Sequence, residues 1–203
     1  MASLLGAKLS VFNDEEGRIL SALKKHGLSV QAAESVETIG IELQVRSLAD
    51  GLEHAAMVDA DSGDLVGTIL DGQEDQIDLG ALLHELPPVT RCVQIHTHPG
   101  SSSFSPEDAL ILVTHVAIQC MAVVGLDGAW YLLSKAANDP SPPREQVWLA
   151  FSIEADALRP KYRAMALSGL LTPEARRRQE THQIWQRVAP LLALRYDQIE
   201  PKG

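Results

Sequence analysis

The run CVQIHTHPGSSSFSPEDALIL, residues 92–112, constrains the fold of this chain more than any other stretch. Residues 90–98 have the β-branched and apolar content of a buried strand. A loop rich in proline, glycine and serine follows. Residues 105–108 (SPED) then resemble a helix start, with a hydroxyl cap, an early proline and an acidic first turn. The sequence therefore predicts a strand, a short loop and a helix in immediate succession.

Patterns elsewhere predict strands and helices in alternation. Residues 35–45 alternate well enough for a strand, residues 52–72 predict two strands around an Asp-Ser-Gly turn, and residues 120–133 predict a strand pair joined by Asp-Gly. Together they indicate an α/β (α+β) class with a mixed central sheet flanked by helices. Helices are predicted at residues 13–27, 78–86, 105–118, 144–168 and 173–196.

The domain organisation follows from a proline-rich break at residues 138–146. A chain of 203 residues suits one domain with extensions. We therefore expect an N-terminal helical extension at residues 1–39, a central domain at residues 40–136 and a C-terminal helical extension at residues 137–203.

Charge and cysteine content exclude some classes of function. The chain carries 27 acidic and 17 basic residues, a net charge of −10, which argues against a nucleic-acid or anionic-membrane surface. The basic run Arg176–Arg177–Arg178 is interpreted as a solvated helical face. Cys92 and Cys120 lie in apolar stretches, as buried thiols of a reducing compartment do. No secretory signal or membrane span is expected, so the prediction is a cytoplasmic protein.

His96 and His98 are candidate metal ligands. Residues i and i+2 of a strand point to the same side, so both imidazoles can approach one ion. Asp108 can supply a third ligand if the helix start folds back beside the strand, and this set suits one Zn²⁺ per chain with a fourth position open for water. The alternative is that residues 105–108 only cap a helix, and the two roles are compatible.

The segment HTHPGSSSFSPED resembles the signature of the JAMM (JAB/MPN) metalloproteases: His-x-His, a short loop, Ser, two residues and Asp. The resemblance covers about residues 40–136. It implies the MPN/JAB (cytidine-deaminase-like) three-layer architecture and zinc held by His96, His98 and Asp108. The loop at residues 99–104 has six residues, one fewer than is usual in the family. This difference affects the loop and the fit of the substrate rather than the ligands.

The resemblance also implies two catalytic residues. An upstream glutamate serves the family as general base, and Glu53 is the preferred candidate because it directly precedes the strand expected at residues 54–60. Glu74 lies in a polar loop and Glu85 near a helix end. The alternative for Glu53 is a solvated carboxylate at a strand edge. Ser105 would donate a hydrogen bond to the developing oxyanion.

The implied function is hydrolysis of the bond after the C-terminal glycine of ubiquitin or a ubiquitin-like protein, in precursor processing or deconjugation. The implied partners are that protein or its conjugates, with E1/E2-like proteins, in a bacterial modification operon of the kind proposed for phage defence. Two alternatives stay open: a non-catalytic MPN scaffold, and a RadC-like or toxin-associated JAB hydrolase with another substrate. Packing or surface roles are expected for His54, His84, His115, His182, Trp130, Tyr131 and Trp185.

Overall fold

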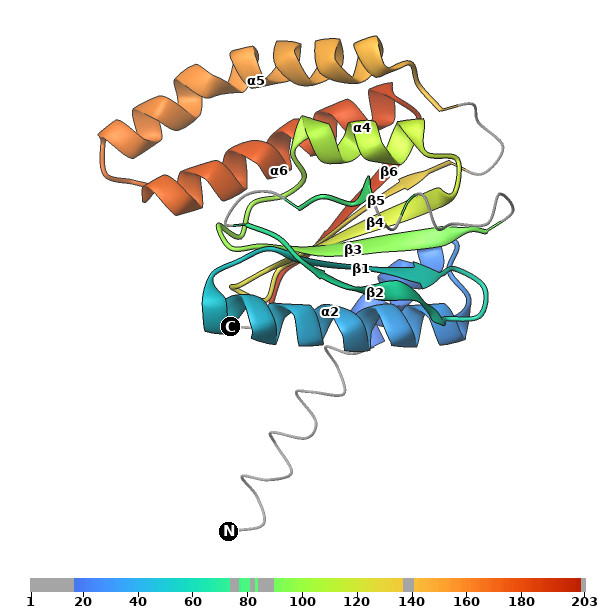
Figure 1. The fold of residues 1–203 in the computed structure, drawn as a ribbon. Helices are drawn as coiled ribbons and strands as arrows, with labels where there is room; N and C mark the ends of the chain where they lie inside the picture. Colours follow the sequence, from blue (N-terminus) through green and yellow to red (C-terminus); the bar gives the residue numbers. More distant parts are fainter. Residues whose placement is uncertain (1–16, 74–76, 81–82, 84–89, 137–140, 202–203) are drawn as a thin grey trace.

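The computed structural model describes residues 17–73, 77–80, 83, 90–136 and 141–201. A mixed sheet of six strands lies at the centre of this part, in the order β2-β1-β3-β4-β5-β6 (Figure 1). Within it β3 and β4 are parallel, and the other four neighbouring pairs are antiparallel. The expected mixed sheet flanked by helices is confirmed. The strands are β1 (His54–Asp59), β2 (Leu65–Asp71), β3 (Cys92–His98), β4 (Ile118–Gly125), β5 (Trp130–Lys135) and β6 (Leu194–Ile199).

Helices cover both faces of the sheet. Helix α2 lies against one face, whereas α4, α5 and α6 lie on the other, with α5 farthest from the strands (Figure 1). α5 packs on both α4 and α6. The described helices are α2 (Val30–Asp50), α4 (Pro106–Thr114), α5 (Arg144–Leu167) and α6 (Pro173–Leu191), and residues 17–25 are also helical.

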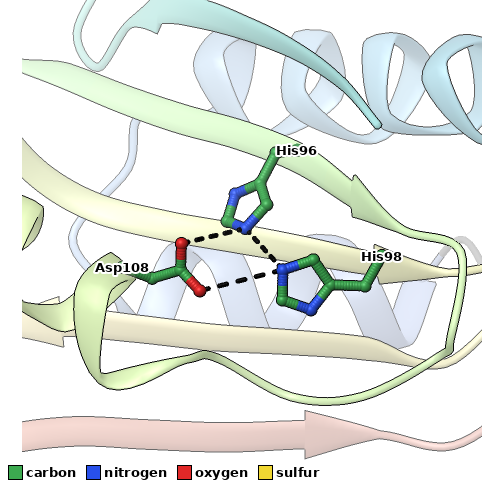
Figure 2. Close-up of side chains that lie close together, drawn as sticks. All are labelled: His96, His98 and Asp108. Carbon is green, nitrogen blue, oxygen red and sulfur yellow. Dashed lines mark hydrogen bonds and ion pairs between the residues drawn. The ribbon is translucent and has the colours of Figure 1, made fainter. Parts of the chain in front are cut away.

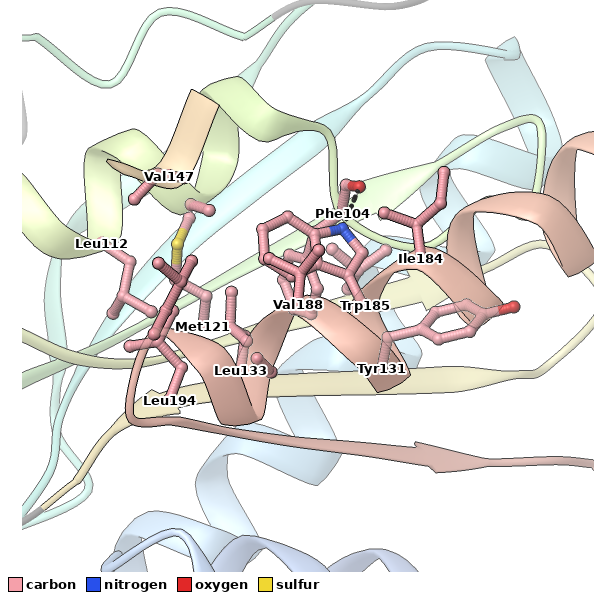
Figure 3. Close-up of a cluster of buried hydrophobic side chains, with 14 of the residues drawn as sticks. Phe104, Leu112, Met121, Tyr131, Leu133, Val147, Ile184, Trp185, Val188 and Leu194 are labelled. Carbon is pink, nitrogen blue, oxygen red and sulfur yellow. Dashed lines mark hydrogen bonds between the residues drawn. The ribbon is translucent and has the colours of Figure 1, made fainter. Parts of the chain in front are cut away.

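Each face of the sheet has its own hydrophobic core. On the α2 side, strand residues such as Ile95 and Leu132 pack with Val36 and Leu43 of the helix. On the opposite side the core includes Trp185 of α6, which is fully buried (Figure 3). The indole Nε1 of Trp185 donates a hydrogen bond of 2.7 Å to the carbonyl oxygen of Phe104. Since Phe104 belongs to the loop after β3, this core also anchors that loop.

The connection between β3 and β4 positions the candidate site. A parallel pair needs a crossover, and α4 supplies it. The chain therefore leaves the C-terminal end of β3 and enters α4 after a short loop. Side chains at the end of the strand and at the start of the helix are brought together by this topology.

The prediction of a strand at residues 35–45 is wrong, because these residues belong to α2. The buried positions Val36, Gly40 and Leu43 recur at helical spacing and face the sheet. The apolar residues that suggested alternation include Ile41 and Val45, and both are exposed.

Two predicted helices are shorter than expected. α4 ends at Thr114, and Ile118 begins β4 instead of continuing the helix. α6 ends at Leu191, Ala193 takes a left-handed φ of 52°, and the chain returns as strand β6. The expected helix at residues 78–86 and the expected start at Asn13 lie largely outside the described residues. The strands of residues 52–72 and 120–133 and the helix of residues 144–168 are confirmed.

Three further findings bear on the sequence predictions. Position 40 lies inside α2, and β6 pairs with β5 as the edge of the sheet, so both expected extensions contribute to the central fold. Cys92 and Cys120 are free and buried, as expected. No helix in the described ranges has the length and apolar character needed to cross a membrane.

Candidate metal centre

The three expected ligands converge at the end of β3. His96 and His98 point from the strand toward Asp108, in the first turn of α4 (Figure 2). The Nε2 atoms of the two histidines are 3.0 Å apart. Asp108 places Oδ1 3.5 Å from Nε2 of His96 and Oδ2 3.7 Å from Nε2 of His98. Of the residues that the structure describes, these three form the one group suited to hold a metal ion.

A capping box orients Asp108. Ser105 is the N-cap of α4, and its hydroxyl oxygen accepts a hydrogen bond of 3.1 Å from the backbone N–H of Asp108. In return, Oδ2 of Asp108 accepts from the backbone N–H of Ser105 at 2.7 Å and from its hydroxyl at 2.8 Å. Because these bonds occupy Oδ2, the other oxygen of Asp108, Oδ1, faces His96. Asp108 therefore takes part in the helix cap and also has a carboxylate oxygen in a position that suits a metal ligand.

Hydrogen bonds at Nδ1 fix which nitrogen each histidine presents. Nδ1 of His96 lies 3.0 Å from Oε1 of Gln94, and Nδ1 of His98 lies 3.0 Å from the carbonyl oxygen of Ser102. Both partners are acceptors in this arrangement, so each Nδ1 carries the proton. Metal-binding histidines are commonly held in this way by a partner at the other ring nitrogen. Each Nε2 therefore offers its lone pair to the centre.

Two lone pairs facing each other at 3.0 Å require a proton or a cation between them. A tetrahedral zinc ion with bonds of about 2.0–2.1 Å would separate its ligand atoms by roughly 3.3 Å. The 3.0 Å between the two Nε2 atoms and the 3.5 Å between Nε2 of His96 and Oδ1 of Asp108 lie on either side of that value, and one ligand atom from each of the three residues lies within 4.8 Å of the others. Two imidazoles and one carboxylate are also a donor set that zinc accepts. The residues present therefore fit the ion.

The electrostatics of the three groups are strongly coupled. Burial alone would lower the pKa of His96, but the Asp108 carboxylate and Glu53 outweigh it and raise that pKa above its ordinary value. Burial, followed by the charge of His96, lowers the pKa of His98 to about 4. Burial opposes ionisation of Asp108, yet the two histidines and Ser105 hold its pKa well below the usual range. The carboxylate of Asp108 therefore favours a proton on His96, whereas His98 resists protonation.

Glu53 lies beside this group. β1 runs antiparallel to β3 with Ala55 opposite His96, so the residue two positions earlier lies near His98. Oε1 of Glu53 is 3.9 Å from Nε2 of His98, and the residue is 7% exposed. It is therefore not a solvated carboxylate at a strand edge. His54 points away from this site, with its ring nitrogens on Asp50 and Asp71, as expected for an adjacent strand residue.

A cavity of about 500 Å³ opens over the centre. Its lining includes residues that the sequence analysis did not identify: Gln94 and Ser102, which hold the histidines, and Arg177 of α6. The interpretation of the arginine run as a solvated helical face is confirmed for Arg177, which is exposed and also lines the cavity. Arg178 is only partly exposed and is paired with Asp127 in the β4–β5 turn.

The histidines and aromatic residues for which packing or surface roles were expected are not among the residues that line the cavity, where the chain is described. His115 is the C-cap of α4, and Nδ1 of His182 hydrogen-bonds to the hydroxyl of Tyr196 at 2.9 Å. Trp130 and Trp185 are buried in the two cores. Glu74, His84 and Glu85 lie outside the described residues.

Comparison of the chain with protein-family models, with curated proteins and with solved structures found no match. Arguments about its function therefore depend on the geometry of this centre and on the resemblance of residues 96–108 to the JAMM signature.

Proposed function

We propose that the chain is a zinc-dependent peptidase or isopeptidase of the JAMM (JAB/MPN) type. One observation carries the proposal: Nε2 of His96 and Nε2 of His98, both with Nδ1 hydrogen-bonded to an acceptor, meet 3.0 Å apart beside Asp108. This is a preformed cation site with three protein ligands. Such a site, opening to a cavity, is typical of catalytic zinc centres.

The MPN/JAB architecture is part of the proposal. It is supported by the layers, with α2 on one face of the sheet and α4 on the other (Figure 1). It is also supported by the order of the parts: Glu53 before β1, the histidines at the end of β3 and the aspartate at the start of the crossover helix. That order is the one the resemblance implies.

The chemistry divides between the ion and the protein. When bound, zinc lowers the pKa of a coordinated water toward about 7 and polarises the scissile carbonyl. Glu53, buried 3.9 Å from the ligand nitrogen of His98, is placed to take a proton and to return it to the leaving amine. Ser105 hydrogen-bonds to Asp108, so its hydroxyl would have to leave Oδ2 of that residue to donate to an oxyanion.

The substrate class comes from the resemblance. We propose the bond after the C-terminal glycine of a ubiquitin-like protein, in a precursor or in a conjugate, with that protein and E1/E2-like proteins as partners in an antiphage operon. An extended tail could lie along the cavity between the loop after β3 and α4.

The test compares wild type with Glu53→Gln. Both proteins are loaded with zinc, the metal content is measured by mass spectrometry, and each is incubated with a ubiquitin-like precursor. We expect equal zinc content and a loss of turnover of about 10²–10⁴-fold in Glu53→Gln, because the general base is removed while the ligands remain.

His96→Ala is the companion variant and should lose both zinc and cleavage. Full cleavage by Glu53→Gln at matched zinc content would reject the assignment of the base. Failure of the wild-type chain to retain zinc would reject the metal centre, and with it the proposed function.

A further inference from the structure

Arg177 is an exposed positive side chain that lines the cavity of the metal centre. It extends from the first turns of α6, in the segment C-terminal to the stretch that resembles the JAMM signature. A Cβ placed on Gly100 would lie 3.5 Å from Nη1 of Arg177. The guanidinium therefore lies over the loop that directly follows His98.

The two neighbours of Arg177 are both neutralised. Nε of Arg176 pairs with Glu180 at 3.1 Å, and Arg178 pairs with Asp127. The side chain of Arg177, in contrast, has no hydrogen bond or ion pair with any residue of the described ranges. A guanidinium offers five N–H donors in a planar fork that matches a carboxylate. These donors have no partner in the described part of the chain, so they are available to a ligand in the cavity that Arg177 lines.

The other charged groups that line the described part of the cavity are of opposite sign or are histidines. Asp108 is committed to the ligand set, Glu53 lies beside His98, and Glu107 is exposed at the start of α4. Arg177 thus supplies a local positive charge beside the loop after β3, in a chain of net charge −10. A carboxylate that enters the cavity would be attracted to this side chain and repelled by the acidic residues of the lining.

The geometry points to Arg177 as a specificity-determining residue that binds a carboxylate of the substrate beside the scissile bond. The inference rests on the proposed function, because it describes the substrate of the same centre. The carboxylate is either an acidic side chain next to the cleaved bond or a free C-terminus. A bidentate Arg–carboxylate pair in a partly exposed cavity corresponds to a preference of about tenfold over the neutral amide.

Small hydroxamates that bind zinc test this preference without turnover. One pair is N-acetyl-Glu-Gly-hydroxamate and its Gln counterpart, which probe an acidic side chain. A second pair is succinyl monohydroxamate and its terminal amide, which probe a free carboxylate end. Dissociation constants for the zinc-loaded full chain are measured by calorimetry for wild type, Arg177→Gln and Arg163→Gln. Arg163, exposed on α5 and outside the cavity lining, is the control for the same loss of charge.

We expect wild type and Arg163→Gln to bind the acidic member of at least one pair about tenfold more tightly, and Arg177→Gln to bind both members equally. The pair that shows the preference identifies the source of the carboxylate. Equal binding of both pairs by wild type, or a preference that persists in Arg177→Gln, would overturn the inference alone. If the zinc-loaded wild type binds no hydroxamate, the proposed function fails and the inference falls with it.

Discussion

Ser105 serves Asp108 in two ways, because its hydroxyl oxygen accepts from the backbone of Asp108 and its proton is donated to Oδ2. Ser105→Ala removes both bonds. We expect a loss of stability of about 1 kcal/mol, which is typical of a lost N-cap, together with weaker zinc binding, because Asp108 is no longer held toward the histidines. Thermal unfolding of the metal-free protein and a zinc competition titration measure the two effects.

Ser29→Ala is the matched control, since Ser29 caps α2 through a bond of 3.0 Å from the N–H of Ala32 and is not among the residues that line the cavity. It should lose similar stability and keep its zinc affinity. Unchanged zinc affinity in Ser105→Ala would mean that the cap does not position Asp108. A residual loss of turnover at matched zinc content would then measure any donation from Ser105 to the oxyanion.

The pKa values of the two histidines predict how zinc binding depends on pH. The pKa of His96 is raised above its ordinary value, so a proton on this residue competes with zinc as the pH falls below that pKa. His98, with a pKa of about 4, stays neutral until the solution is far more acidic. Apparent zinc affinity should therefore be constant above the pKa of His96 and fall about tenfold per pH unit below it. Titration with a chromophoric chelator between pH 5 and 8 gives the slope. Release of two protons for each zinc ion bound within this pH range would contradict the assignment of a single competing proton, on His96.

Local patterns were sufficient to predict that the side chains of His96, His98 and Asp108 come together. The period of two along a strand and the cap of a helix fix where His96, His98 and Asp108 point, and both rules involve only near neighbours. The position of Arg177 could not be predicted from such local patterns. It lies 79 positions after His98 (177 − 98) and reaches the cavity only because α6 packs over the loop after β3. No pattern within its own helix distinguishes it from Arg176.

Helix α2 shows why an element can be misjudged from its apolar residues. Its buried face includes small or polar residues such as Ala32, Gly40 and Ser47, whereas Val45 is 60% exposed. A search for large apolar side chains therefore finds the wrong face and the wrong period. The tertiary reason is a large neighbour, because Trp130 of β5 fills the space above Gly40.

Gly40→Ala tests this close approach. A Cβ at position 40 would overlap the indole ring of Trp130, so α2 or the indole must shift. Overpacking of this kind costs typically about 1–3 kcal/mol, and we expect the midpoint of thermal unfolding to fall by several degrees. Gly17→Ala is the control, because nothing lies within 4 Å of its added Cβ, and replacing a helical glycine there should stabilise the chain slightly. Equal unfolding temperatures for Gly40→Ala and wild type would show that the packing is looser than described.

The two ends of the described chain are joined through the sheet. Ring nitrogens of His26, which follows the helix at residues 17–25, lie 2.7 Å from the hydroxyl of Ser134 in β5 and 2.9 Å from Oδ2 of Asp197 in β6. β6 completes the sheet beside β5, and α6 supplies Trp185 to the core that anchors Phe104 (Figure 3). The proline-rich break in the sequence suggested a helical extension added to the central domain. The return of β6 depends on a left-handed turn at Ala193, a residue that gives no turn signal.

We expect that a fragment of residues 1–136 will neither unfold cooperatively nor bind zinc. Removing β6 uncovers the edge of β5, and removing α6 exposes the core around Phe104. Loss of a buried tryptophan side chain alone costs about 3–5 kcal/mol, and the net stability of a domain is only about 5–15 kcal/mol. Circular dichroism during heating and zinc titration of the fragment are compared with a chain ending at residue 200, which retains β6. A fragment that melts cooperatively and holds zinc would show that residues 1–136 fold independently of α6 and β6.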